Sequence, residues 1–468
     1  MSRNLLRGPI PSAIGFGMKI ACFIYAAYGT KFSTGASILK DQEKRPRPLK
    51  SSLAPRFQKK LGLREKDPSS DTSLGDVEGL DTIYHALLED AIAVSASDLH
   101  LDPGAEDFCL RMRVDGALHD AVLIPKTLSE RMLNHFKVQA QLDPGPVIRP
   151  SEGWAEYQLD ERKIHLRISC MPTVSGDKLA IRIFDAGRIR AEMTELGMNA
   201  KQSNLIQEWL GNIQGLFLVV GAVGSGKSTT LYALLNQLRK QTRSVVSIED
   251  PVEYRIEGVN QVQVSPETDF DFPQALRSVM RLDPDDIMFG EIRDPLSAAA
   301  AVDAAATGKV LLSTLHSRDA VGAVMSLRNY GVKDHEIAAL LETVVSQRLV
   351  RTLCDDCKKE VPVSDHDKAW LKSIGRKTPK TLYAAAPEGC GNCGGIGYRG
   401  RTGVFEVWRL REKEKALIIE HPAEQVLRQQ VRDWGLPSLF DAAWNLLTSG
   451  TTSLDEIRPL CGFVAKEE

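Results

Sequence analysis

The sequence predicts an α/β fold with a parallel sheet, and two observations carry this prediction. Residues 216–220 form an apolar run, and a glycine-rich loop separates it from the helical pattern of residues 230–238, which gives the order strand, loop and helix. Residues 245–248, 287–289 and 310–316 contain further apolar strands with polar side chains at their ends. The carboxyl ends of parallel strands meet at one crevice, so these polar side chains are expected to converge.

The glycine-rich loop fits the pattern G-x-x-x-x-G-K-[ST], which is typical of phosphate-binding loops between a strand and a helix. Its glycines let backbone N–H groups turn toward phosphate oxygens, and the helix N-terminus adds positive potential. Lys227 is expected to reach the β- and γ-phosphates, and the Ser228 hydroxyl to bind Mg²⁺. An ordinary glycine-rich turn is the alternative, which the flanking segments disfavour. The predicted nucleotide-binding residues are Gly221, Ala222, Val223, Gly224, Ser225, Gly226, Lys227, Ser228 and Thr229.

Acidic side chains and one histidine lie at the ends of the other predicted strands. A parallel sheet would bring them to the same edge as the phosphate-binding loop. The residues expected at this crevice are Glu249, Asp250, Glu253, Glu291 and His316.

The length and composition of the chain limit its class. A chain of 468 residues is long for one hydrophobic core, so two or three domains are expected. The net charge is −2, and no basic stripe with interleaved aromatic residues occurs, which disfavours a nucleic-acid motor. Residues 9–29 are mostly apolar, and residues 40–66 are rich in lysine, arginine and proline. We interpret residues 1–78 as a tail and linker that is poorly ordered or touches a membrane, with a solvated tail as the alternative.

Three ordered segments follow the phosphate-binding loop. They are Ile-Glu-Asp-Pro-Val-Glu-Tyr at 248–254, Asp-Pro-Asp through Gly-Glu-Ile-Arg-Asp at 283–294, and Leu-Ser-Thr-Leu-His at 312–316. Together they closely resemble the aspartate box, atypical Walker B motif and histidine box of the bacterial type II secretion and type IV pilus assembly ATPases. The resemblance runs from about residue 96 to about residue 457. It implies a RecA-like P-loop ATPase core, a smaller N-terminal α+β domain that is PAS-like, and a C-terminal helical, zinc-binding subdomain.

The resemblance also implies hydrolysis of ATP with Mg²⁺. Glu291 is the best candidate to orient or deprotonate the attacking water, because it ends a strand beside the loop, and Glu253 is the alternative. Asp250 would hold Mg²⁺ through water. His316 would sense the γ-phosphate, although a lone histidine is more often structural.

The assembly implied by the resemblance is a homo-hexamer on the cytoplasmic side of the inner membrane. It would dock on a platform protein of a pilus or secretion apparatus and power pilin or pseudopilin assembly or type II secretion. Arg277 and Arg281, four residues apart on a predicted helix, match arginines used at nucleotide and subunit contacts, with an ordinary basic helix face as the alternative. An alternative function is that of a pilus-retraction or type IV secretion ATPase, but these proteins usually lack paired cysteines. A non-hydrolysing scaffold is disfavoured by the intact motif residues Lys227, Ser228 and Glu291.

Four of the eight cysteines form two C-x-x-C pairs, separated by residues 358–389. Two such pairs supply four thiolates, enough to close a tetrahedral zinc site, and a reducing cytoplasm argues against disulfides. Many members of the resembling family carry such pairs. The alternative is four free thiols. The expected zinc ligands are Cys354, Cys357, Cys390 and Cys393.

Residues 79–187 are expected to form the N-terminal domain, residues 195–343 the ATPase core and residues 344–468 the C-terminal subdomain. In the N-terminal domain, helical spacing alternates with strand-like runs, and Asp-Gly at 115–116 is a hairpin signal. This domain departs from the family at Trp154, where a basic residue is usual.

Overall fold

The computed structural model describes residues 50–61, 79–185, 193–240, 242–265 and 270–463. The apolar segment predicted to touch a membrane lies outside these ranges. Within them, no helix combines the length and the hydropathy that crossing a bilayer requires.

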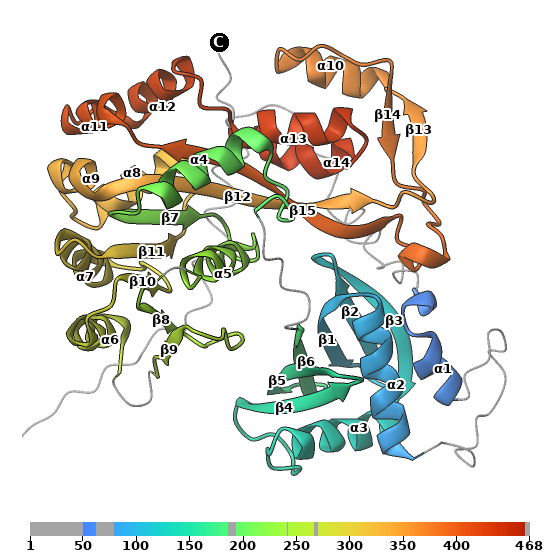
Figure 1. Ribbon diagram of the computed structural model, residues 1–468. Helices are drawn as coiled ribbons and strands as arrows, with labels where there is room; N and C mark the ends of the chain where they lie inside the picture. Colours follow the sequence, from blue (N-terminus) through green and yellow to red (C-terminus); the bar gives the residue numbers. More distant parts are fainter. Residues whose placement is uncertain (1–49, 62–78, 186–192, 241, 266–269, 464–468) are drawn as a thin grey trace, which may run out of the picture. The chain divides into compact units, whose positions relative to one another are not determined.

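The N-terminal α+β region is built on a six-stranded antiparallel sheet in the order β3-β2-β1-β6-β5-β4 (Figure 1). Helices α2 and α3 cover one face, and their apolar side chains form a single core with the inward residues of the strands. Asp115 and Gly116 have φ angles of 49° and 84°, which fits the predicted hairpin turn between β2 and β3. The elements are α2 (Leu80–Ala93), β1 (Ala96–Pro103), β2 (Asp107–Val114), β3 (Ala117–Pro125), α3 (Lys126–Gln139), β4 (Ser151–Leu159), β5 (Arg162–Thr173) and β6 (Gly176–Asp185).

A short helical segment precedes this region and belongs to its core. The 3₁₀ helix η1 (Ser51–Leu53) and helix α1 (Pro55–Lys60) lie in the stretch that the sequence assigned to the tail. Leu53 and Phe57 are fully buried, and the Phe57 N–H donates to the buried Asp90 carboxylate at 2.9 Å. The linker prediction is therefore wrong for these residues. A few apolar side chains at helical spacing outweigh the basic, proline-rich composition around them.

Trp154 lies on β4, and its side chain is half exposed. Its ring stacks on that of Phe184 with centroids 5.9 Å apart, and the Arg167 guanidinium lies 5.9 Å from the ring centroid. Arg167 also pairs with Glu152. Trp154 is therefore part of an aromatic and charged cluster on this sheet.

The second sheet has seven strands in the order β15-β12-β7-β11-β10-β8-β9. All neighbours from β12 to β9 are parallel, and only β15 runs antiparallel, against β12. The expected boundary between residues 343 and 344 falls inside β12, so the chain beyond it still contributes to this sheet. The strands are β7 (Leu216–Val220), β8 (Val245–Glu249), β9 (Asn260–Gln263), β10 (Asp286–Phe289), β11 (Val310–Leu315), β12 (Leu341–Leu353) and β15 (Tyr398–Arg409).

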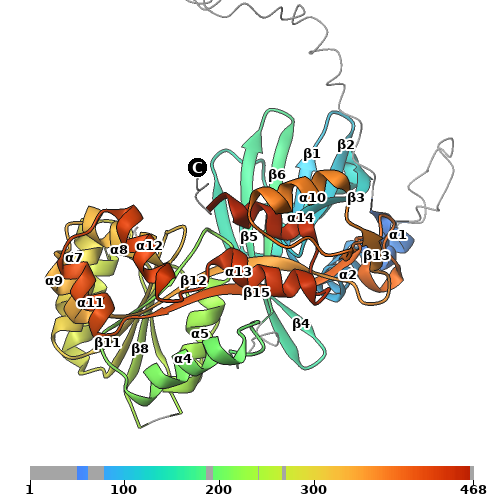
Figure 2. The same cartoon turned by 90° about the horizontal axis from the view of Figure 1, so that it is seen from above.

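Helices cover both faces of the second sheet (Figure 2). Helices α4 and α5 form one apolar layer against it, while α6 to α9 with α11 and α12 form the other. Strands β7, β8, β10 and β11 are buried throughout, as expected for parallel strands covered on both sides. The helices are α4 (Ala200–Gly211), α5 (Lys227–Leu238), α6 (Phe272–Val279), α7 (Pro295–Ala306), α8 (Ala320–Asn329), α9 (Asp334–Leu340), α11 (Glu412–Ile419) and α12 (Glu424–Asp433).

The region between β12 and β15, together with the last helices, forms a smaller apolar cluster of its own. It contains a two-stranded antiparallel sheet and, close to β15, the second cysteine pair. Its elements are β13 (Lys359–Pro362), α10 (Asp365–Ser373), β14 (Thr381–Ala384), η6 (Gly391–Cys393), α13 (Leu439–Thr448), α14 (Leu454–Ile457) and η7 (Arg458–Phe463).

Candidate functional site

The predicted phosphate-binding loop joins β7 to α5, in the expected order of strand, loop and helix. Gly226 precedes the first turn of α5 with φ 87°, a conformation that favours glycine. A Cβ atom at Gly221 would lie 2.5 Å from the Gln347 carbonyl oxygen, so the loop passes too close to β12 for a side chain there. The Lys227 ammonium donates to the carbonyl oxygens of Gly221 and Ala222 at 3.1 and 3.2 Å. Burial lowers the pKa of Lys227, and the Glu291 carboxylate opposes that shift.

Glu291 and His316 meet at the carboxyl edge of the neighbouring strands β10 and β11. His316 Nε2 lies 2.8 Å from Glu291 Oε1, and Nδ1 of the same ring lies 3.2 Å from the Gly221 carbonyl oxygen. The ring therefore connects the carboxylate to the phosphate-binding loop. Glu291 is held on its other oxygen by Arg293 Nε at 2.8 Å.

Arg293 continues this chain of contacts to the strand on the far side of β10. Its guanidinium lies 3.8 Å from the Asp250 carboxylate, just beyond the end of β8. The 283–294 motif contains Arg293, but the sequence alone predicts no role for this residue. The signal was its position two residues after Glu291, where a side chain can turn back onto the preceding carboxylate.

Glu253 approaches the site from the same segment as Asp250. Burial raises the pKa of the Glu253 carboxyl, while hydrogen bonding from the Ser228 hydroxyl lowers it. Ser228, the residue expected to bind Mg²⁺, therefore lies beside the Glu253 carboxyl. Of the predicted residues, the structure brings Asp250, Glu253, Glu291 and His316 to the edge of the sheet that carries Lys227.

Glu249 does not follow the expectation that it faces the phosphates. It is 4% exposed, and its carboxylate accepts hydrogen bonds from Tyr232, from Ser247 at 2.5 Å and from Gln261 at 3.0 Å. Side chains alternate along a strand, so Glu249 shares with Ser247 the face of β8 that α5 covers. It therefore takes part in a buried network under the loop.

Arg277 and Arg281 do not share one α-helix. Helix α6 ends at Val279, and Arg281 lies in the following 3₁₀ helix η5 (Met280–Leu282). Both side chains are exposed, and neither forms an ion pair with any residue that the structure describes. A role at a subunit contact stays a prediction.

The acidic residues at the amino end of β10 are separated from the site by the length of that strand. Asp286 is fully buried and forms two 2.7 Å hydrogen bonds with Arg243. Asp283 is exposed and pairs with Lys309 at 2.7 Å. These residues hold the amino end of β10, whereas Glu291 follows its carboxyl end.

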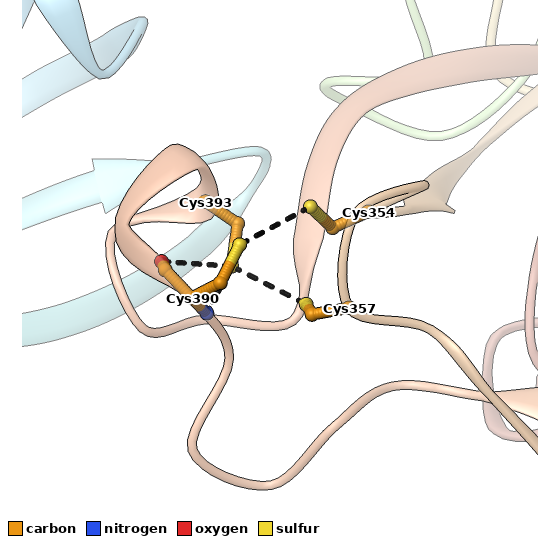
Figure 3. Close-up of side chains that lie close together, drawn as sticks. All are labelled: Cys354, Cys357, Cys390 and Cys393. Atoms are coloured by element: carbon orange, nitrogen blue, oxygen red, sulfur yellow. Dashed lines mark hydrogen bonds between the residues drawn. The ribbon is translucent and has the colours of Figure 1, made fainter.

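The two C-x-x-C pairs come together although they are far apart in sequence (Figure 3). All four sulfur atoms lie within 4.8 Å of one another. The separations are 3.7 Å for Cys354 to Cys390 and 3.8 Å for both Cys357 to Cys393 and Cys390 to Cys393. Tetrahedral zinc with Zn–S bonds of about 2.3 Å places its sulfurs about 3.8 Å apart. The four cysteines therefore fit zinc.

Backbone groups support a thiolate at this site. Burial alone would raise the pKa of the Cys393 thiol. The N–H groups of Cys390 and Gly397, each 3.1 Å from its sulfur, together with the thiols of Cys390 and Cys357, lower this pKa to about 7. Metal-bound cysteines are thiolates, which accept such bonds.

The family model of the type II/IV secretion system proteins matches residues 74–458. The chain belongs to this family. It is 37% identical over 375 residues to the type II secretion system ATPase E of Vibrio cholerae serotype O1, which covers 80% of this chain and 74% of that protein. It is 35% identical over 421 residues to the type IV pilus assembly ATPase PilB of Myxococcus xanthus, which covers 84% of this chain and 74% of that one.

Solved structures agree with this family fold. The Legionella pneumophila ATPase DotB has a TM-score of 0.61 at 18% identity and covers 84% of this chain and 98% of its own. The pilus retraction motor PilT, solved with ADP, has a TM-score of 0.53 at 22% identity and covers 80% and 95%. The predicted fold class is confirmed, and the family identifies the chain as a secretion or pilus ATPase.

Proposed function

We propose that the chain hydrolyses ATP with Mg²⁺ at the 221–229 loop and works as a homo-hexamer at the cytoplasmic face of the inner membrane. There it would power pilin or pseudopilin assembly or type II secretion through a membrane platform protein. The observation that supports hydrolysis most directly is the contact of Glu291 with His316, which ties a carboxylate to the loop. The similarity to a type II secretion ATPase and to a type IV pilus assembly ATPase supports these two processes.

Hydrolysis of ATP requires that the phosphates be held, that their charge be neutralised and that one water be oriented. The loop N–H groups and Lys227 bind the phosphates. Mg²⁺, when bound, neutralises charge on the β- and γ-phosphate oxygens, and Ser228 and Asp250 are the residues that would hold it.

Glu291 orients the attacking water and accepts its proton in this proposal. Arg293 and His316 fix both of its oxygens, so the direction of the carboxylate is determined by β10 and β11 together. Glu253 is the alternative base, because it lies beside Ser228 and burial raises its pKa. His316 would report the γ-phosphate, since it contacts both the loop and Glu291.

Zinc at the four cysteines is proposed as a structural site. Cys354 directly follows β12, and Cys393 lies shortly before β15. A closed tetrahedral site would join the ends of these two long strands and has no open position for catalysis.

The test of ATP hydrolysis is phosphate release by the purified chain in the presence and absence of Mg²⁺. Lys227→Ala should lose nucleotide binding as well as turnover, and Lys309→Ala, at the opposite end of the sheet, should keep both. An inactive wild-type chain that is folded and hexameric would refute the proposal in favour of the scaffold. A strain that lacks the gene is then complemented with Lys227→Ala or Lys309→Ala. Loss of piliation or loss of secretion with the inactive variant identifies the process that the protein powers.

A further inference from the structure

The segment that carries Glu253 is attached to the sheet by side chains that the proposed mechanism does not use. Residues 250–259 link β8 to β9 without a helix or strand. The Val252 N–H donates to Gln263 at 3.1 Å, and the Ile256 N–H donates to Gln261 at 2.7 Å. Both glutamines lie on β9. Between them, the Glu253 N–H donates to the hydroxyl of Tyr232 at 3.3 Å, and Tyr232 lies on α5.

Tyr232 and Ser228 lie on the same face of α5. They are four residues apart, a spacing that places side chains one above the other on a helix. Ser228 hydrogen-bonds to the Glu253 carboxyl, while Tyr232 accepts from the Glu253 N–H. One residue is therefore held at two points, its backbone and its carboxyl, by successive turns of the helix that begins with Lys227.

Glu249 fixes the hydroxyl of Tyr232. The hydroxyl donates to Glu249 Oε2, which leaves its lone pairs free to accept the Glu253 N–H. Glu249 Oε1 is occupied by Ser247 and Gln261. Tyr232 is 1% exposed, and burial together with the Glu249 charge raises its pKa, so the hydroxyl keeps its proton.

We propose that Tyr232 and Glu249 are positioning residues that set where the Glu253 carboxyl lies relative to Ser228 and the phosphate-binding loop. This inference rests on the proposed ATP hydrolysis at that loop. Neither side chain contacts the loop's phosphate-binding groups among the described hydrogen bonds, so both act through Glu253. Their loss should lower kcat and leave the KM for ATP nearly unchanged.

Tyr232→Phe removes the hydroxyl and keeps the ring. Its matched control is Tyr254→Phe. The rings of Tyr232 and Tyr254 pack edge to face with their centroids 4.4 Å apart, but the Tyr254 hydroxyl has no hydrogen-bond partner in the described residues. Small misplacements of a reacting group cost up to about 10²-fold in rate, so we expect a 10- to 10²-fold fall in kcat for Tyr232→Phe and an unchanged kcat for the control. Glu249→Gln should act in the same direction as Tyr232→Phe.

The decisive measurement repeats Tyr232→Phe in a Glu253→Gln background. If Tyr232 acts through Glu253, the second substitution adds no further loss of kcat, whereas a general packing role would lower kcat in both backgrounds. ATP affinity and the thermal unfolding midpoint are measured alongside for each variant.

Each outcome decides the inference separately from the proposed function. An active wild type with normal kcat in Tyr232→Phe, normal kcat in Glu253→Gln, or additive losses in the double variant would overturn the inference and leave ATP hydrolysis standing. Unfolding of both Tyr232→Phe and Glu249→Gln would assign the network to stability alone and also overturn it. A wild type without ATPase activity would contradict the proposed function itself.

Discussion

His316 Nε2 lies 2.8 Å from Glu291 Oε1, and the same ring contacts the Gly221 carbonyl oxygen through Nδ1. Both neighbours of the ring are hydrogen-bond acceptors, so a neutral imidazole donates to only one of them at a time. The histidine box, the Walker B carboxylate and the phosphate-binding loop therefore form one connected unit. A change in any one of them is expected to reach the other two.

The first prediction concerns Glu291, the carboxylate that we propose activates the attacking water. Glu291→Gln should leave ATP bound and lower turnover by roughly 10²–10⁴-fold, the usual contribution of a general base. The amide keeps the shape of the side chain and its contact with Arg293, but it cannot accept the proton. ATP affinity and steady-state phosphate release measure the two effects. Normal turnover in Glu291→Gln, with loss of turnover in Glu253→Gln, would transfer the role to Glu253.

The second prediction concerns assembly. The exposed residues Arg277 and Arg281 have no ion-pair partner within the described chain, and arginines supplied to a transferred phosphoryl group contribute roughly 10³–10⁵-fold in rate. We expect turnover per chain to rise as hexamers form, and Arg277→Ala and Arg281→Ala to reduce this rise without weakening ATP binding. Lys372→Ala on α10 serves as an exposed control. Full activity in a sample that light scattering shows to be monomeric would contradict the prediction.

The third prediction concerns the cysteine cluster. Elemental analysis should find one zinc per chain, and Cys354→Ser should lose it because three thiolates no longer close the tetrahedral site. Hydrogen exchange should then increase around residues 350–403, while ATP binding at Lys227 is retained. Cys461→Ser, a buried cysteine outside the cluster, should keep its zinc. Freshly purified, reduced protein without metal would refute the assignment.

The fourth prediction concerns Glu406, which lies buried on β15 and accepts the Ala320 N–H at 3.1 Å. Burial and then the Asp319 charge raise the pKa of Glu406 from 4.5 to about 7, against the opposing charges of Arg432 and Arg428. Between these pH values the folded chain keeps a proton that the unfolded chain has released. Stability from this group is therefore full below about pH 4.5 and is lost as the pH rises to about 7.

Glu406→Gln removes this dependence, since the amide stays neutral and still accepts the N–H. The variant should gain stability relative to wild type as the pH rises from about 5 to about 8, by at most about 3 kcal/mol. Thermal unfolding midpoints across this range measure the difference, with Glu412→Gln as the exposed control. A difference that does not change with pH would show that Glu406 carries no such proton.

Local patterns predicted the parts of the fold that depend on neighbouring residues. The strand, loop and helix around Lys227 follow from an apolar run, three closely spaced glycines and a helical pattern, all within one short segment. The hairpin at Asp115 was likewise predictable, because turn chemistry acts over a few residues. The spacing of the two C-x-x-C pairs was enough to predict a zinc site.

Tertiary structure decided which partner each of these side chains meets. Glu249, Asp250 and Glu253 have the same chemistry and nearly the same position in sequence. Their different surroundings depend on α5, β9 and β10, which no local pattern places against them. The same holds for β12, whose membership of the ATPase sheet rests on pairing with β7, more than a hundred residues earlier. The sequence by itself determined the chemistry available to this protein, since that chemistry resides in short motifs. Only the packing of distant strands and helices decided which carboxylate contacts the loop and which is buried beneath it.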